Sequence, residues 1–231
     1  MTDTASPNRW QLALGQRLTQ ALAESRLAHP PQADDTASAT GTHWRLPPRD
    51  TAPSGAAPAL LELLGTSIAG GPETLLAHCL RHYRQLAHDG ESDDLGRALA
   101  AYLGACRQAF DQEALTPQRW QAVVQWLKAW VLDALPWDSV PLAQRQEAFE
   151  RFAVLAVALG EWTVQASRQG QAALASATWM ARTSLRGQLG LDLPALCAVL
   201  RGLDASIAAN PSAGAVDLGA AAASGLGSKP V

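Results

Sequence analysis

Valine and isoleucine are scarce in this chain. Its 231 residues include 10 Val and 2 Ile, against 46 Ala and 34 Leu. Because β-branched residues favour strands whereas Ala and Leu favour helices, this composition argues against an extensive sheet. A chain of this length also buries a full hydrophobic core. We therefore predict an all-α protein, a single bundle of about six to seven helices.

The chain also lacks an excess of positive charge. It carries 18 basic and 21 acidic residues, which gives a formal net charge of −3. Non-specific binding to nucleic acid depends on a broad positive field. We therefore expect no nucleic-acid partner.

A disulfide framework and a membrane span are missing as well. The cysteines Cys79, Cys106 and Cys197 are widely spaced, and each lies in an apolar helical pattern typical of a buried free thiol. The longest apolar run, 152–159, is far shorter than the roughly 20 residues that cross a bilayer. Residues 1–10 show no secretory signal. These features predict a cytoplasmic protein.

Composition divides the chain into four segments. Residues 1–29 form an expected amphipathic helix, and the pattern leaves open whether it packs on the body, on another subunit or on a partner. Residues 30–58 are rich in Pro, Asp, Thr and Ser and predict a linker, with Trp44 docking it locally. Residues 59–208 are the expected bundle domain. Residues 209–231 are mostly Ala, Gly and Ser, which predicts a disordered tail.

Proline, cap residues and glycine mark the helices of the bundle. Helices are expected over 72–88, from the cap Ser92 to Phe110, over 117–135, over 141–162, over 171–189 and over 194–203. In the second of these, Asp93 and Asp94 are expected in the first turn, where the helix dipole favours acids. The helix that follows Pro141 is apolar nearly all round between Ala153 and Leu159, so we expect it to be the most buried.

Several of these boundary motifs occur together in one known family. Tyr83 precedes Ser92-Asp93-Asp94-Leu95, with Ala98 and Ala101 following; Gln144-Arg145-Gln146-Glu147-Ala148-Phe149-Glu150 and Leu189-Gly190-Leu191-Asp192 come later. Over about Pro72 to Asp192, the chain resembles an uncharacterised bacterial family of all-helical domains of unknown function. The resemblance implies a bacterial helical bundle without an assigned active site.

His78 and His82 are the candidate metal ligands. Residues four apart share one face of a helix, so the two imidazoles can bind one zinc ion if His88 or an acidic residue completes the set. No Glu stands between them, as it does in zinc hydrolases, and no second Cys or His pair lies nearby. The sequence therefore favours two surface histidines beside a core stripe, and we expect no cofactor.

Tryptophan is unusually frequent for so few other aromatic residues. The chain has 8 Trp against 3 Phe and 2 Tyr. Trp126 and Trp130 lie in the helix expected over 117–135 and Trp137 lies at its exit, and all three are off the main apolar face of that helix. They are either part of a wide core face or a protein-binding patch, since Trp is enriched at interface hot spots.

These observations lead to two functional hypotheses. The first is a non-enzymatic cytoplasmic protein of a bacterium that binds another protein as a chaperone, adaptor or immunity-type inhibitor. It rests on the helical scaffold, the surplus of Trp and the separate amphipathic helix at the N-terminus. The alternative is a metal-dependent hydrolase-like enzyme centred on His78 and His82. The oligomeric state and the partner stay open.

Overall fold

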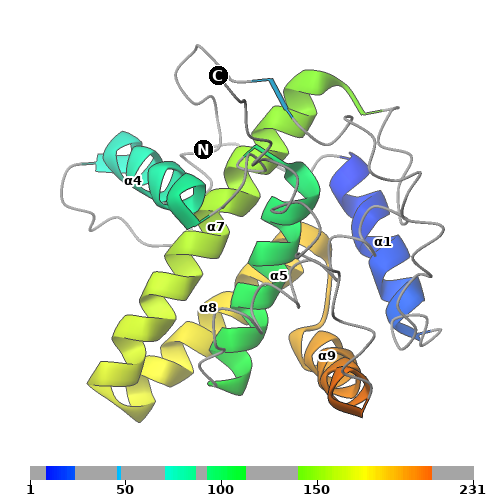
Figure 1. Cartoon of the computed structure of the whole chain (residues 1–231), viewed down its shortest axis with the longest axis vertical. Coiled ribbons are helices and arrows are strands. Elements are labelled where there is room, and N and C mark those ends of the chain that lie inside the picture. The colour runs from blue at the N-terminus through cyan, green and yellow to red at the C-terminus, as the bar shows by residue number, and fades with distance from the viewer. Residues whose placement is uncertain (1–8, 24–45, 48–70, 87–92, 113–139, 210–231) are drawn as a thin grey trace, which may run out of the picture.

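The structure of the protein is a computed structural model, which describes residues 9–23, 46–47, 71–86, 93–112 and 140–209. This part of the chain contains six helices and no strand, which confirms the all-α prediction (Figure 1). The helices are α1 (Arg9–Ala23), α4 (Gly71–Leu86), α5 (Leu95–Asp111), α7 (Leu142–Gln169), α8 (Gln171–Leu189) and α9 (Leu193–Ala209).

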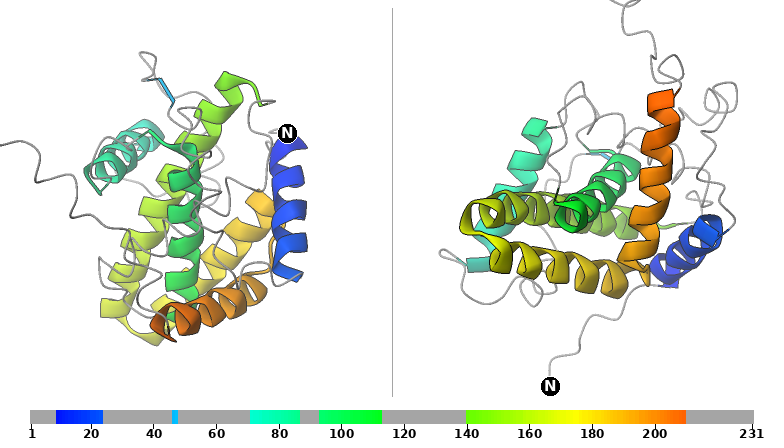
Figure 2. Two further views of the ribbon diagram at one scale, coloured as in Figure 1. Left: turned by 45° about the vertical axis from the view of Figure 1, so that its right-hand side comes forward. Right: turned by 90° about the horizontal axis from the view of Figure 1, so that it is seen from below.

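Helix α7 is the central element, as its sequence predicts. It packs against α4, α5 and α8, and Figure 2 shows it running through the middle of the described helices. Phe152, Leu155 and Leu159 are fully buried. The ring of Phe152 stacks on Tyr102 of α5, with the ring centroids 5.5 Å apart. The apolar side chains around this helix are therefore covered by α4, α5 and α8 on several sides.

Helices α7 and α8 form an antiparallel hairpin around Gly170. The backbone of Gly170 has φ 99°, a conformation that favours glycine, so α7 ends there and α8 begins one residue later. Helix α8 then ends at Gly190, which has φ 67° and donates its N–H to the carbonyl of Arg186. This is the left-handed cap that the sequence predicts.

Helix α5 begins later than its predicted cap. Asp94, rather than Ser92, is the N-cap: its carboxylate accepts a hydrogen bond from the N–H of Arg97 at 2.8 Å. Leu46 donates its backbone N–H to the carbonyl of Asp93, and this contact keeps the chain extended up to Asp94. Both acids therefore have structural roles, since the side chain of Asp93 accepts a hydrogen bond from Arg84.

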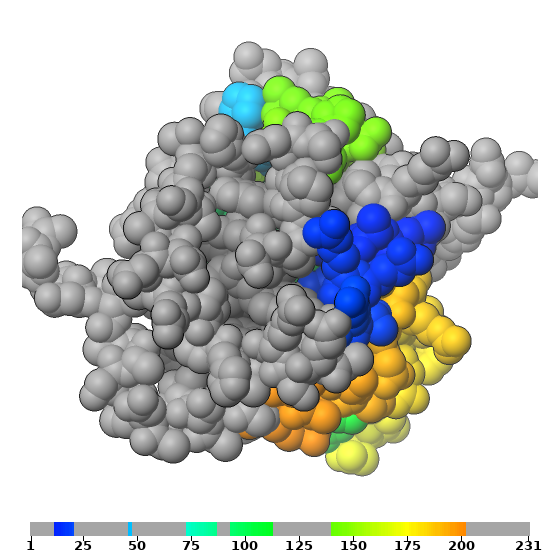
Figure 3. All heavy atoms as spheres, turned by 90° about the vertical axis from the view of Figure 1, so that its right-hand side faces the viewer, coloured from blue at the N-terminus to red at the C-terminus, as the bar shows by residue number. Residues whose placement is uncertain are grey.

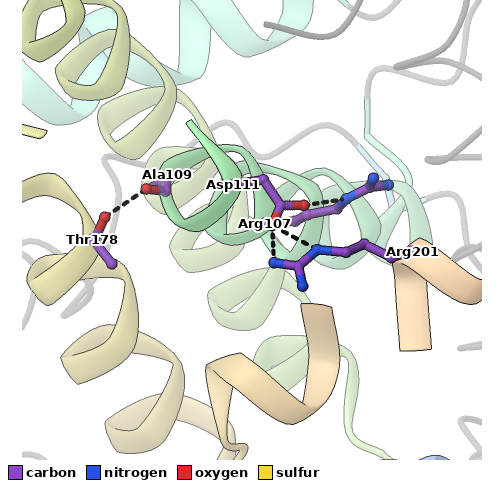
Figure 4. A network of polar contacts seen from close by, with 5 residues as sticks. All are labelled: Arg107, Ala109, Asp111, Thr178 and Arg201. Atoms are coloured by element: carbon purple, nitrogen blue, oxygen red, sulfur yellow. Dashed lines mark hydrogen bonds and ion pairs between the residues drawn. The ribbon is translucent and has the colours of Figure 1, made fainter. Parts of the chain in front are cut away.

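The last turn of α5 is fixed to two other helices (Figure 4). Thr178 of α8 donates a hydrogen bond to the carbonyl of Ala109 at 2.7 Å. Asp111 accepts hydrogen bonds from the buried guanidinium of Arg107 and from Arg201 of α9. Carbonyls near a helix end lack partners within the helix, and Thr178 supplies one for Ala109. The carboxylate of Asp111 joins α5 to α9.

Helix α1 lies on the body of the molecule. It packs against α8 and α9, and Figure 3 shows it lying across them. Leu14 and Leu18 are buried, and Gly15 lies so close to the backbone of Leu189 that a Cβ atom there would overlap the carbonyl oxygen. Of the three docking possibilities that the sequence leaves open, the structure therefore shows packing on the chain's own helices.

Two residues of the predicted linker are described, and both contact the bundle. Leu46 is buried and joined to Asp93, and the carbonyl of Pro47 accepts a hydrogen bond from Gln146 of α7. The predicted docking residue Trp44 lies outside the described residues. Leu46 is therefore an attachment point that the sequence prediction did not name.

Other predictions lie outside the described residues. These are the helix expected over 117–135, most of the linker and the tail. The three cysteines are described, and they are buried free thiols as predicted. None of the described helices has the length and apolar character needed to span a membrane.

Candidate metal centre

His78 and His82 lie along one edge of α4, beside the face that enters the core. That face consists of Leu76, Cys79, Leu80 and Tyr83, which are all buried. The side chain of His78 is 56% exposed and that of His82 is 36% exposed. The four-residue spacing therefore brings both imidazoles to one side of the helix, as predicted.

Glu161 of α7 completes the cluster from a second helix. Its Oε1 lies 3.2 Å from Nε2 of His78 and 2.5 Å from Nδ1 of His82. The two imidazoles themselves lie with their ring centroids 6.0 Å apart. One ligand atom from each residue lies within 4.8 Å of the other two. Packing of α4 on α7 thus brings Glu161 to His82 and His78, which precede it in the chain by 79 and 83 positions.

Glu161 is exposed because it lies where α7 leaves the core. Residues 148–159 are buried, Gly160 is partly exposed, and Glu161 is 43% exposed. An acidic side chain in the preceding buried stretch would need a partner for its charge. Two residues beyond that stretch, the carboxylate of Glu161 reaches both the solvent and the two imidazoles.

The three ligand atoms are arranged closely enough to hold one transition-metal ion. Two imidazole nitrogens and one carboxylate oxygen form the ligand set of several zinc sites with an open fourth position. Ligands of a tetrahedral zinc ion stand about 3.3 Å from one another. The 3.2 Å separation between His78 and Glu161 matches this value, and the 2.5 Å separation from His82 needs to widen by roughly 0.8 Å.

The same atoms also form a simple polar contact when protons occupy the nitrogens. In that state the rings of His78 and His82 donate hydrogen bonds to Oε1 of Glu161. Metal ligation requires both of these nitrogens to be free of protons. Protons and a metal ion would therefore compete for the same nitrogen atoms.

Cys79 lies between the histidines in sequence but belongs to the core. Burial, followed by the negative charge of Glu161, raises the pKa of its thiol from 9.0 to about 12. In zinc hydrolases of the H-E-x-x-H type, the residue after the first histidine is a glutamate that acts as general base. Because a buried thiol occupies that place here, α4 presents two candidate metal ligands without that base.

The structure describes some of the predicted site residues and not others. It brings His78 and His82 together with an acidic residue, which is one of the two additions that the sequence analysis named. His88, the other candidate for completion, lies outside the described residues. The tryptophans Trp126, Trp130 and Trp137 lie outside them too.

Glu161 is the residue that sequence reasoning missed. It is far from the histidines in the chain, and only the crossing of α4 and α7 brings it near them. The available signal was an acid two residues after the apolar run 152–159, on a helix expected to be central.

Comparison with known proteins identifies a family and no function. A family model described as a family of unknown function, DUF6683, matches residues 14–197. This range extends beyond the Pro72–Asp192 resemblance at both ends and includes all three candidate ligands. No curated protein and no solved structure matches the chain.

Proposed function

The chain belongs to DUF6683, a family of unknown function, and because membership assigns no activity, we propose from its own side chains that the protein binds a divalent transition-metal ion. The ligands are His78, His82 and Glu161, and zinc is the expected metal. The observation that supports this proposal is the convergence of three ligand atoms from two helices within 4.8 Å.

Metal binding is favoured over metal-dependent hydrolysis. An ion held by three side chains keeps an open position for water or for a ligand from another molecule. Hydrolysis also requires a base beside that water, and Cys79 takes the place where such a base stands in zinc hydrolases. The hydrolase-like activity is the narrower version of this proposal and requires a base from another part of the chain.

Zinc titration of the metal-free protein, purified without a histidine tag, tests the proposal. Calorimetry should give one site per chain. Glu161→Gln should weaken zinc binding about a hundredfold. Structural zinc sites with four ligands gain roughly 3 kcal/mol per ligand, and loss of one ligand of that strength corresponds to about this change in affinity. His82→Ala should have a similar effect.

Glu73→Gln is the matched control, since Glu73 is an exposed acid on α4 away from the cluster. It removes one negative charge and should leave zinc affinity within about twofold of the wild type. Binding of less than about a tenth of an equivalent of zinc, or equal losses in Glu161→Gln and Glu73→Gln, would contradict the metal site.

Protein binding is a second proposal, supported by a separate observation. Trp162 and Trp179 are the tryptophans whose side chains the structure describes, and they are 40% and 64% exposed. Exposed Trp is typical of surfaces that bind other proteins. We place the chaperone, adaptor or immunity-type role here, in the cytoplasm of a bacterium, where buried free thiols such as those of this chain persist.

Isolation of the untagged protein from its native cell tests this second proposal. A stoichiometric partner should co-purify, and replacement of Trp126 by Ala should release it if the predicted patch carries the contact. Equal recovery of the partner with Trp126→Ala and with the wild type would remove that patch from the proposal. Absence of any stoichiometric partner would contradict protein binding itself.

A further inference from the structure

Helix α8 has an outer face that no other described helix covers. Seen from below, α8 runs along the edge of the described helices, with α7 on its inner side and α1 near its end (Figure 2). Its buried residues include Ala177, Ala181, Ser184 and Leu185, and α8 packs against α5 as well as α7 and α1. The opposite side faces outward.

Trp179, Arg182 and Arg186 lie together on that outer face. Spacings of three and four residues place them on successive turns of one side of the helix. Trp179 is 64% exposed, the largest exposed fraction among the large apolar side chains that the structure describes. Arg182 and Arg186 are also exposed, and no ion pair between described residues engages either of them.

The charge of this face is opposite to that of the whole chain. The chain has a formal net charge of −3, yet α8 contains two Arg and no Asp or Glu. The helix dipole favours a basic residue in the last turn, which accounts for Arg186. It accounts neither for Arg182, one turn earlier, nor for an exposed Trp beside it.

We propose that Trp179, Arg182 and Arg186 form a docking surface on α8 for an acidic protein segment. This inference rests on the second proposed function, protein binding, and is independent of the metal site. Trp and Arg are the side chains most enriched at the centres of protein interfaces. The guanidinium groups select carboxylates, and the indole supplies apolar area next to them.

An anionic membrane is the competing occupant, and the face fits it less well. Helices that bind in a membrane interface bury a broad apolar side, whereas the other exposed residues on this side of α8 are small or polar, among them Ala175 and Thr183. One Trp provides an anchor for a protein contact but little area for insertion into lipid.

The probe is a synthetic helical peptide of Glu and Leu, with a Lys and Leu peptide of equal length as the comparison. Binding to the full chain is followed by calorimetry at two salt concentrations. The acidic peptide should bind, more weakly at high salt, and the basic peptide should not. Trp179→Ala and Arg182→Glu should each weaken binding about tenfold or more.

Arg168→Glu is the matched control, because Arg168 is an exposed arginine in the last turn of the neighbouring helix α7. It makes the same charge change and should alter affinity by less than about threefold. Arg168, Trp179 and Arg182 are all exposed. Circular dichroism of each variant checks that the helices are retained.

Several outcomes would overturn the docking surface. They are no binding of the acidic peptide, equal binding of the basic peptide, equal losses in Arg182→Glu and Arg168→Glu, and binding to anionic phospholipid vesicles in place of the peptide. Loss of peptide binding in Trp126→Ala but not in Trp179→Ala would overturn this surface and retain protein binding. Zinc affinity of the Trp179→Ala protein should be unchanged, which separates this inference from the metal proposal.

Discussion

Single buried side chains carry much of the stability of this bundle, and Phe152 is the clearest example. It is fully buried at the centre of α7 and stacks on Tyr102, whose hydroxyl in turn forms a 2.7 Å hydrogen bond with Ser184 of α8. One aromatic pair and one polar contact therefore join α5, α7 and α8. A polar pair in such surroundings is stable because each of its groups has a partner.

Phe152→Ala should lower the free energy of unfolding by about 3 to 5 kcal/mol, through lost apolar burial and the cavity that remains. Urea melts measure the change. Trp179→Ala is the control, since an exposed side chain should change stability by less than about 0.5 kcal/mol. A loss below about 1 kcal/mol for Phe152→Ala would show that α7 is not surrounded as the structure has it.

Buried thiols make the free energy of unfolding depend on pH in the alkaline range. Burial, followed by the charge of Asp111, raises the pKa of Cys197 from 9.0 to about 12. Above about pH 9 the unfolded chain therefore loses a proton that the folded chain keeps, and the free energy of unfolding falls as pH rises towards 12. The contribution is fully present below pH 9.

Urea melts between pH 8 and pH 10.5 check this sign, because each such thiol contributes at most about 1.4 kcal/mol per pH unit. Cys197→Ala should make the fall shallower. The chain has 2 Lys and 2 Tyr, so few other groups titrate in this range. Stability that rises with pH here, or an identical slope in the variant, would contradict the prediction.

At the scale of elements, close approach of backbones decides how α1 is held. Gly15 packs against the carbonyl of Leu189, at the point where α8 ends. Any larger residue must push α1 away from α8, and Leu14 and Leu18 would then lose part of their burial. A glycine inside a helix otherwise costs stability, so its presence here has a packing reason.

Gly15→Ala should therefore lower the free energy of unfolding by about 1 to 3 kcal/mol, the usual cost of overpacking. Gly187→Ala is the matched control: it lies on α8 with open space around it, and Ala should be neutral or stabilising by up to about 1 kcal/mol. Hydrogen exchange in α1 should become faster in the first variant alone. Equal stability of both variants would show that α1 does not depend on this contact.

Local sequence signals predicted where the helices begin and end better than they predicted which residues contact one another. Prolines, Gly170 and Gly190 mark the ends of α7 and α8 because helix termini depend on neighbouring residues. The start of α5 was misplaced because Ser92 and Asp94 are equally good caps, and the choice depends on Leu46, which is distant in sequence. Tertiary contacts of this kind leave no periodic pattern.

The candidate site is incomplete in sequence for the same reason. The four-residue spacing of His78 and His82 shows that they share a helix face, but Glu161 joins them only through the packing of α4 on α7. At the scale of the whole molecule, the proposed metal site is therefore a product of folding. A bound ion would add to stability by linking two helices that the unfolded chain does not hold together.

The boundary of the folded unit gives the last prediction. The family match ends at residue 197, α9 ends at Ala209, and residues 210–231 consist largely of Ala, Gly and Ser. Such a segment has little apolar surface to bury against the cost of ordering its backbone. Truncation after Ala209 should therefore shift Tm by less than about 3 °C, roughly 1 kcal/mol for a protein of this size. Thermal melts of the full and truncated chains decide the matter, and a larger fall in Tm would mean that part of 210–231 packs on the bundle.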